Sequence, residues 1–401
     1  MSQTIPTSLA SSSPSPADSY FAEAVPGGRE GAVRQGTVSV LHIINGQHFA
    51  GAERVQVHLG RCLPSEGFRA DFACLTPGRF LEQCPRDESE VFAVPMRSRY
   101  DLGVAGRILA AVGSRRYQLL HAHTPRSAMV AARIAKRLDV PWIYHVHSPT
   151  ANDSSRWLQN QLNYWVERWS LRSAAHLITV SNSLRKQMIA EGWAADRVSV
   201  VANGVPAIRP PRQQIPTPGG RWVLGMVALM RPRKGLEVAL RALVELRKRE
   251  LDVRLRCIGP FETAEYEASI RRLISELGLE DAVELSGFAS DVPAALAELD
   301  AMVLPSLYGE GMPMVVLEAM AAGLPVVATR VEGTPEAIRH GRDGLLAEPN
   351  SPQSLAEQLR LLVEGEYDWQ ALSESAVRRH AEQFSDRAMA HHTAGVYRRV
   401  V

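Results

Sequence analysis

Short apolar runs rich in β-branched residues recur along the chain from Val38 onward, and segments with helical periodicity separate them. Such runs are typical of strands buried in a parallel sheet, and the segments between them are typical of crossover helices. In the first half we expect helices over Val55–Cys62 and Gly106–Val112. The predicted strands there are VSVLHII (38–44), QLLHAH (118–123), PWIYHV (141–146), HLITV (176–180) and VSVVA (198–202). This alternation predicts a parallel sheet with helices on both faces.

A second series of the same kind follows residues 204–220, GVPAIRPPRQQIPTPGG, whose proline and glycine content indicates a linker. It contains a helical pattern over Leu236–Arg249 and predicted strands at Trp222–Val227, Leu255–Ile258, Val283–Leu285, Met302–Leu304 and Val326–Thr329. We therefore predict an α/β fold of two Rossmann-like, doubly wound domains, 36–205 and 221–384, with a linker over 206–220. Two such domains imply a ligand cleft between them, at the carboxyl ends of the strands.

Composition predicts a disordered N-terminal tail and argues against nucleic acid as a partner. Residues 1–35 are rich in Ser, Pro, Ala and Gly with few large apolar groups, so we expect them to be disordered. The whole chain has 401 residues, of which 45% are hydrophobic and 22% charged, which suffices for two domains with separate cores. A formal net charge of +2 argues against a nucleic-acid-binding protein.

The cysteines give no sign of a metal site or a disulfide framework. Cys62, Cys74, Cys84 and Cys257 are scattered, with no C-x-x-C pair and no histidine at metal spacing. No apolar run approaches the roughly 20 residues that cross a bilayer, and the N-terminal residues lack the features of a signal peptide. We therefore expect a soluble, cytoplasmic protein.

The richest candidate chemistry lies in Ser306–Val327, SLYGEGMPMVVLEAMAAGLPVV, where Glu310 and Glu318 flank a glycine turn that opens a helix. With Pro313 in the first helical turn, the N–H groups of Gly311–Val315 would face an anion at the positive end of the helix dipole. A diphosphate could bind there without a metal, and Glu318 could accept hydrogen bonds from ribose. Two glutamates at this spacing are also common on a solvated helix face, so spacing alone does not decide.

The complete string resembles the signature of the retaining glycosyltransferases of family 4. That signature is a glutamate, seven residues, E-A-M-A and then G-x-P-V-V-A-T, and its letters stand at Glu310, Glu318–Ala321, Gly323 and Pro325–Thr329. The resemblance implies the GT-B fold, a nucleoside-diphosphate sugar as donor substrate and no cofactor. Glu310 would bind hydroxyls of the transferred sugar. The donor-binding backbone would be that of Gly311, Met312, Pro313 and Met314.

The first domain contributes a glycine loop after its opening strand. The loop NGQHFAGAE (45–53) resembles the G-G-A-E loop of the family, with Ala50 in place of the first glycine. Gly51 allows close approach of a ligand to the backbone just before a helix begins. The resemblance implies that Gly51 and Ala52 lie against the donor diphosphate or the acceptor. It also implies that Asn203, in VVANGV, helps to shape the cleft wall and the hinge.

Alternating histidines end two of the predicted strands: His121 and His123 in HAHTP, and His145 and His147 in YHVHSP. Residues two apart on a strand share a face, as metal ligands would, but we do not predict a metal site. Both segments resemble family motifs, and His147 matches the histidine that approaches the hydroxyls and reacting centre of the donor sugar. For the other three we expect partly buried, hydrogen-bonded rings.

A basic loop, ALMRPRKG (228–235), follows a predicted strand of the second domain. Exposed basic residues are usually only solvated, but one of the chain's four lysines, Lys234, falls where the family places its phosphate-binding K-G pair. The position of the family arginine holds Leu229, and we expect Arg231 to substitute through a shifted loop. No D-x-D triplet occurs in the chain, so Lys234, Arg231 and the helix N–H groups are predicted to stabilise the leaving diphosphate without a metal.

The resemblance implies retention of anomeric configuration, an acceptor docked on the first domain, and a final helix, 385–401, that packs back on that domain. Aromatic residues within Arg156–Arg172 could contact a membrane surface and suit a lipid-linked acceptor, or they could belong to the core. A glycan, lipid-linked or small-molecule hydroxyl is the expected acceptor, in polysaccharide or glycoconjugate biosynthesis. Two alternatives stay open, a sugar-nucleotide epimerase of similar fold and a non-catalytic nucleotide-sugar-binding protein.

Overall fold

The computed structural model describes residues 36–47, 49, 51–84, 89–98, 101, 103–148, 168, 170–212 and 214–401. All of them belong to one compact unit, Gln35–Val401. The predicted disordered tail, 1–35, lies outside the described residues. So do Ala50 and most of the aromatic segment Arg156–Arg172, and those predictions stay untested.

The first sheet contains seven parallel strands in the order β3-β2-β1-β4-β5-β6-β7. The strands are β1 (Val38–Ile44), β2 (Phe68–Cys74), β3 (Val91–Ala93), β4 (Leu119–Ala122), β5 (Trp142–Val146), β6 (His176–Thr179) and β7 (Val198–Val200). The helices between them are α2 (Gly51–Cys62), α3 (Arg79–Gln83), α4 (Val104–Val112), α5 (Pro125–Leu138) and α7 (Asn182–Ala190). This order reverses direction between β1 and β4, which is where a doubly wound sheet opens a crevice for ligands.

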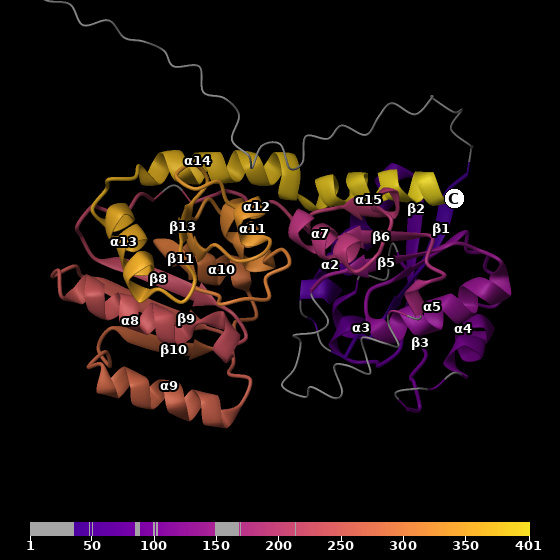
Figure 1. The fold of residues 1–401 in the computed structure, drawn as a ribbon, viewed down its shortest axis with the longest axis horizontal. Helices are drawn as coiled ribbons and strands as arrows, with labels where there is room; N and C mark the ends of the chain where they lie inside the picture. The colour runs from indigo at the N-terminus through magenta and orange to yellow at the C-terminus, as the bar shows by residue number, and fades with distance from the viewer. Residues whose placement is uncertain are drawn as a thin grey trace, which may run out of the picture. The chain divides into compact units, whose positions relative to one another are not determined.

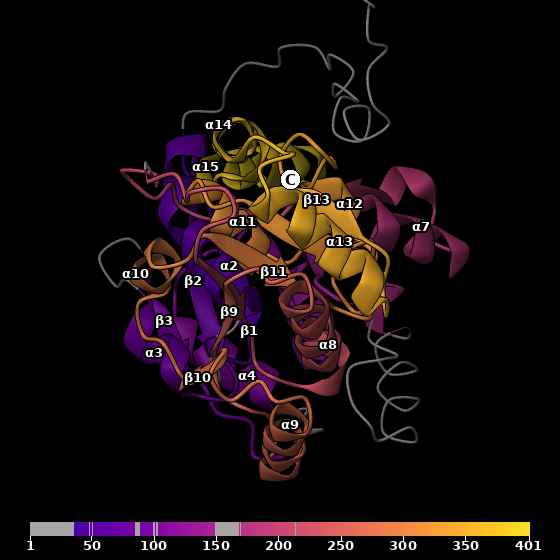
Figure 2. The same ribbon diagram turned by 90° about the vertical axis from the view of Figure 1, so that its left-hand side faces the viewer.

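The second sheet contains six parallel strands in the order β10-β9-β8-β11-β12-β13. The strands are β8 (Trp222–Val227), β9 (Val253–Ile258), β10 (Val283–Gly287), β11 (Ala301–Leu304), β12 (Val326–Thr329) and β13 (Leu345–Ala347). The helices are α8 (Leu236–Arg247), α9 (Ala264–Glu276), α10 (Val292–Ala297), α11 (Met314–Ala321), α12 (Thr334–Ala337) and α13 (Pro352–Val363). Helices α8 and α13 pack side by side and bury their apolar faces in one core with β8, β9 and β11 (Figures 1 and 2).

The predicted strands are all present close to their expected bounds, and the two Rossmann-like sheets confirm the predicted fold class. Three strands were not predicted: β2, β3 and β13. Asp71 interrupts the apolar pattern of β2, yet it is buried, because its carboxylate accepts hydrogen bonds from the Tyr117 hydroxyl (2.9 Å) and the Glu90 N–H (2.9 Å). Arg69 of β2 also donates to this carboxylate (3.2 Å), but the Tyr117 hydroxyl and the Glu90 N–H come from outside β2, so the pattern of β2 alone did not predict that Asp71 is buried.

The C-terminal helices are α14 (Trp369–Arg379) and α15 (Asp386–Val400), with a π-helical turn between them over His380–Phe384. Helix α15 packs beside α2 (Figure 1), and its Met389 and Tyr397 are buried in the same core as Ile44 and Leu119 of the first sheet. Val205 pairs with Ser385 where the chain returns to this sheet. The individual domain boundaries stay predictions.

Candidate active site

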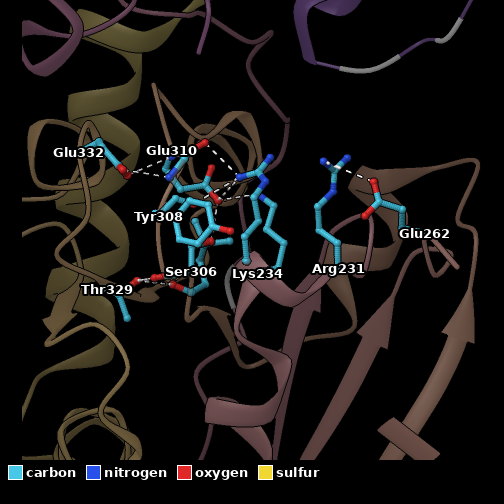
Figure 3. Close-up of polar contacts among 11 residues, drawn as sticks. Arg231, Lys234, Glu262, Ser306, Tyr308, Glu310, Thr329 and Glu332 are labelled. Carbon is cyan, nitrogen blue, oxygen red and sulfur yellow. Dashed lines mark hydrogen bonds and ion pairs between the residues drawn. The ribbon is translucent and has the colours of Figure 1, made fainter. Parts of the chain in front are cut away.

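Glu310 lies in the loop between β11 and α11 and is buried, with 5% of its surface exposed. Its Oε1 accepts hydrogen bonds from Lys234 Nζ (2.5 Å) and from the Ser306 hydroxyl (2.6 Å), as Figure 3 shows. The backbone N–H of Glu310 donates to the carboxylate of Glu332 (3.1 Å), and Thr329 Oγ1 donates to the Ser306 carbonyl (2.5 Å). Hydrogen bonds to the carboxylate of Glu310 and from its backbone N–H therefore fix the position of this side chain.

Lys234 comes from a short 3₁₀ turn, η4 (Pro232–Lys234), which follows β8. The next residue, Gly235, has φ +71° and lies so close to β11 that an added Cβ would be 2.0 Å from the Pro305 carbonyl oxygen. Only glycine meets both requirements, which explains the K-G pair structurally. Burial lowers the pKa of Lys234, and the adjacent Glu310 carboxylate opposes that shift. The Glu310 carboxylate therefore favours the charged form of the buried Lys234 ammonium group.

The other two basic residues of this loop behave differently. Arg233 Nη1 donates to the carbonyl of Gly309 (3.0 Å) and lies 3.9 Å from Glu310 Oε1. Arg231 points toward Glu262, with 3.6 Å between Nη1 and Oε1, and not toward Glu310 (Figure 3). The structure thus brings Arg233 to the carboxylate as well as Lys234, whereas the predicted role of Arg231 stays a prediction.

Glu318 lies on α11 and is almost completely buried, at 5% exposure. Its carboxylate forms an ion pair with Arg54 of α2, the helix that follows β1 of the first sheet. Burial raises the pKa of Glu318, and the Arg54 guanidinium opposes that rise. The alternative of a solvated helix face is therefore wrong for this glutamate, since its side chain faces the first domain.

The start of α11 meets the first domain at several of the predicted residues. An added Cβ on Gly311 would lie 2.3 Å from the carbonyl oxygen of His147, and one on Gly51 would lie 3.4 Å from the Met314 side chain. Asn203 Nδ2 donates to the carbonyl of Met312 (3.1 Å). The structure therefore gathers these residues from both domains.

The positions of Pro313 and Ala52 in their helices refine the predictions for this region. Pro313 is the N-cap residue of α11 with an extended ψ of 109°, and so it precedes the first helical turn in which we predicted it. The N–H groups of Met314 and Val315 still lack partners within the helix, as in any first turn. Ala52 is the second residue of α2, and its carbonyl accepts a hydrogen bond from Gln56.

The histidines that end β4 and β5 stack above the first sheet. His147 Nε2 is 3.1 Å from His123 Nδ1, and burial lowers the pKa of His147 to about 4. His121, His123 and His145 are fully buried, not partly buried as predicted. Both ring nitrogens of His145 lack a hydrogen-bond partner among the described residues, so the expected hydrogen bonds are wrong for that ring. It packs flat on its neighbours instead, with 4.2 Å between its centroid and that of His147.

These rings are close enough together to hold a metal ion. One ring nitrogen from each of His42, His121 and His123 lies within 4.8 Å of the other two, and the same holds for one nitrogen from each of His123, His145 and His147. Imidazole nitrogens in groups of three are common ligands of zinc and related ions. The prediction of no metal site therefore stays a prediction.

Comparison with known proteins agrees with this geometry. The family Glycosyl transferases group 1 matches residues 208–379, and Glycosyltransferase Family 4 matches residues 49–209. This chain belongs to glycosyltransferase family 4. The putative colanic acid biosynthesis glycosyltransferase WcaL of Salmonella typhimurium is 32% identical over 46% of this chain and 46% of its own length. The chain thus spans about half the length of the first curated relatives that it matches.

Other members of the family match over more of their length. The D-inositol 3-phosphate glycosyltransferase of Corynebacterium glutamicum is 28% identical over 70% of this chain and 72% of its own. Among solved structures, Anabaena HepE in complex with UDP and glucose has a TM-score of 0.78 and 22% identity, and covers 90% of this chain and 100% of that one. That likeness places the fold in the GT-B class, as the resemblance implied.

Three residues of this family member's site were not selected from its sequence. Arg54 directly follows the glycine loop, and Arg233 directly precedes Lys234, so their positions next to these motifs could have indicated both residues. No sequence motif indicated Glu336 of α12. Its carboxylate accepts hydrogen bonds from the N–H groups of Asn182 (2.7 Å) and Ser183 (2.8 Å) at the start of α7, and so ties the second domain to the first.

Proposed function

We propose that this protein transfers a sugar from a nucleoside-diphosphate sugar to a hydroxyl acceptor, with retention of configuration and without a metal. The observation that carries the proposal is the buried Glu310 carboxylate, fixed by Lys234 and Ser306 beside the start of α11. In such a site a carboxylate can bind sugar hydroxyls, while an ammonium group and backbone N–H groups bind a diphosphate. Anabaena HepE, of similar fold, is described in complex with UDP-glucose, which supports a donor of this class.

The reaction breaks the bond between the anomeric carbon and the leaving phosphate oxygen. Negative charge grows on the diphosphate, and Lys234 together with the N–H groups near Met314 stabilises it in the proposed mechanism. The acceptor oxygen bonds to the anomeric carbon on the same face, and its proton passes to the leaving phosphate. Glu310 holds the sugar, and His147 approaches its hydroxyls. Arg231 would turn from Glu262 toward the diphosphate.

Donor binding would also change the partner of Glu318. In the structure this carboxylate pairs with Arg54. If ribose hydroxyls donate to Glu318, they compete with that guanidinium, and the nucleotide replaces a contact between the two domains by contacts of its own. We infer that this exchange couples nucleotide binding to the position of α2.

The acceptor is proposed by class only. The names of the relatives include colanic acid biosynthesis and D-inositol 3-phosphate, which supports a glycan, lipid-linked or small-molecule hydroxyl in polysaccharide or glycoconjugate biosynthesis. Among the described residues, no helix has the length and apolar character needed to span a bilayer. A cytoplasmic site, with peripheral membrane contact for a lipid-linked acceptor, is part of the proposal.

The test is a calorimetric screen of the purified protein against UDP, GDP, ADP and their sugars, with and without magnesium. We expect one nucleotide series to bind with a Kd that magnesium leaves unchanged. Glu318→Gln should raise the Kd for that nucleotide about tenfold, which corresponds to about 1.4 kcal/mol of binding free energy. Glu364→Gln, an exposed glutamate paired with Arg360, is the matched control and should bind as the wild type does.

Turnover separates the alternatives. A transferase converts the bound donor only when an acceptor hydroxyl is present, and proton NMR of the product reports the anomeric configuration. An epimerase would alter the sugar nucleotide with no acceptor, and a non-catalytic protein would bind it without change. An inverted product, or binding that requires magnesium, would contradict the mechanism proposed above.

A further inference from the structure

Five buried or half-buried imidazoles, from strands β1, β4 and β5 and from the residues that follow β4 and β5, form one cluster with a tyrosine from the C-terminal helix. His42 stands opposite His121 in the pairing of β1 with β4, and His123, His145 and His147 follow along β4 and β5. Tyr397 of α15 reaches this cluster and is fully buried. A strand presents alternate residues on one face, which is why the histidines stack.

Hydrogen bonds join four of these rings to Tyr397 in a single file. His147 Nε2 lies 3.1 Å from His123 Nδ1, and His123 Nε2 lies 3.1 Å from His42 Nδ1. His42 Nε2 lies 3.2 Å from the Tyr397 hydroxyl, which in turn lies 2.6 Å from His121 Nδ1. The file therefore runs from the end of β5, beside Gly311, to the C-terminal helix.

Because each neutral imidazole has a single N–H proton, all hydrogen bonds along this file must point the same way. Burial lowers the pKa of His42 to about 3 and that of His123 well below its ordinary value, so these rings are neutral near pH 7. A neutral imidazole has one N–H donor and one acceptor nitrogen. Each ring in the file that donates at one nitrogen must therefore accept at the other, and one choice at Tyr397 decides every tautomer up to His147.

The distances at Tyr397 indicate that choice. An O–H donor makes shorter hydrogen bonds than an N–H donor does. The 2.6 Å contact fits donation by the Tyr397 hydroxyl to His121 Nδ1, and the 3.2 Å contact fits donation by His42 Nε2 to the phenol oxygen. His42 Nδ1 then accepts from His123 Nε2, and His123 Nδ1 accepts from His147 Nε2.

We propose that Tyr397 is a positioning residue that fixes the tautomer of His147, with the proton on Nε2 and a free lone pair on Nδ1. His147 could then accept a hydrogen bond from a hydroxyl of the donor sugar but could not donate one through that nitrogen. This consequence for catalysis rests on the proposed function; the tautomer itself does not. The proposal takes protons to bridge these ring nitrogens, although the same nitrogens form two groups that are close enough to hold a metal ion, so the experiment also measures bound metal.

The experiment is nitrogen-15 NMR of histidine-labelled full-length protein near pH 7, without nucleotide, with the His147 signals assigned by their loss in His147→Gln. We expect the wild type to carry the His147 proton on Nε2. Tyr397→Phe removes the phenol oxygen and should give a mixture of tautomers or the reverse one. Tyr117→Phe removes another buried tyrosine hydroxyl of the same domain, bonded to Asp71, and should leave the His147 signals unchanged.

Three results would overturn the inference: a wild-type proton on Nδ1, unchanged His147 signals in a folded Tyr397→Phe, or one equivalent of metal that leaves the protein when His42 is replaced by Gln. The first and third results are obtained without a tyrosine variant, so the proposal can still be contradicted if Tyr397→Phe does not fold. If the tautomer is as expected and no nucleotide sugar is turned over, the proposed function fails while this inference stands. If turnover is present, kcat should fall in Tyr397→Phe with little change in KM for the donor, and Tyr117→Phe should keep both.

Discussion

The two sides of the site are polar in different ways. The second domain places charged groups there, Lys234 paired with Glu310, and Glu318, whose partner is Arg54 of α2 in the first domain. The first domain places neutral imidazoles there, joined by single hydrogen bonds. A buried charge is tolerated when a counter-charge is adjacent, whereas a buried neutral ring needs only one donor and one acceptor. This difference is consistent with the proposal that the second domain binds the diphosphate and the first domain aligns a hydroxyl of the sugar.

The largest expected effect comes from breaking the charged side. Lys234→Met leaves Glu310 buried without its ammonium partner, and loss of one partner of a buried pair costs about 3–5 kcal/mol of unfolding free energy. Nucleotide binding should be lost as well. Adding Glu310→Gln to the same chain should restore most of the stability but not the binding, as urea unfolding and calorimetry would measure.

The matched control for this experiment is Lys248→Met, since Lys248 pairs with Glu245 on an exposed surface. An exposed pair contributes about 0–1 kcal/mol, so stability and binding should both stay near the wild-type values. Equal losses in the two lysine variants would contradict the distinction between a site pair and a surface pair.

A second prediction concerns the place where the two sides touch. Gly311→Ala would put a Cβ 2.3 Å from the His147 carbonyl oxygen, so the backbone must move. We expect a loss of about 1–3 kcal/mol of stability, as for other overpacked positions, and weaker nucleotide binding. Gly395→Ala on α15 meets no atom within 4 Å and should instead add up to about 1 kcal/mol, as alanine does in helices. Opposite signs in thermal unfolding are the expected result.

The neutral side should respond to acid. The pKa of His147 is lowered from 6.5 to about 4 by burial, so between these values the unfolded chain binds more protons than the folded protein does. The stability due to the neutral ring is complete above pH 6.5 and is lost as the pH falls toward 4, by on the order of 1–2 kcal/mol at pH 5. Urea midpoints should therefore fall less steeply with acid in His147→Gln than in the wild type.

His391→Gln, on the exposed surface of α15, is the control for this titration, and its curve should follow that of the wild type. If the curves of wild type and His147→Gln were parallel from pH 7 to pH 5, the neutral ring would contribute no acid sensitivity. The contrast between charged and neutral sides would then lose its support at His147.

The smallest effect is expected for Arg231→Gln. Its ion pair with Glu262 is long and half-exposed, so stability should change by about 0–1 kcal/mol. If Arg231 turns toward the diphosphate during transfer, kcat/KM should still fall, by about 3- to 10-fold, or roughly 0.7–1.4 kcal/mol. Unchanged kinetics would remove Arg231 from the site and leave Arg233 as the arginine beside Lys234.

The sequence by itself determined the two sheets and the family. Apolar runs such as Val38–Ile44 and Trp222–Val227 are strands because local periodicity and β-branched residues express burial directly. The family signature from Glu310 to Thr329 can likewise be recognised from the sequence alone, since its residues are near one another along the chain. Local signals of this kind are readable without coordinates.

Only the tertiary structure decided which groups are partners. The ion pair of Glu318 joins α11 to α2, and the hydroxyl of Tyr397 meets a ring 276 residues earlier in the chain. Asp71 is buried in a strand because Tyr117 and Glu90 come to it from elsewhere. The sequence pattern shows whether a residue is apolar, but a buried polar residue depends on the partner that satisfies it, and folding alone brings that partner into contact.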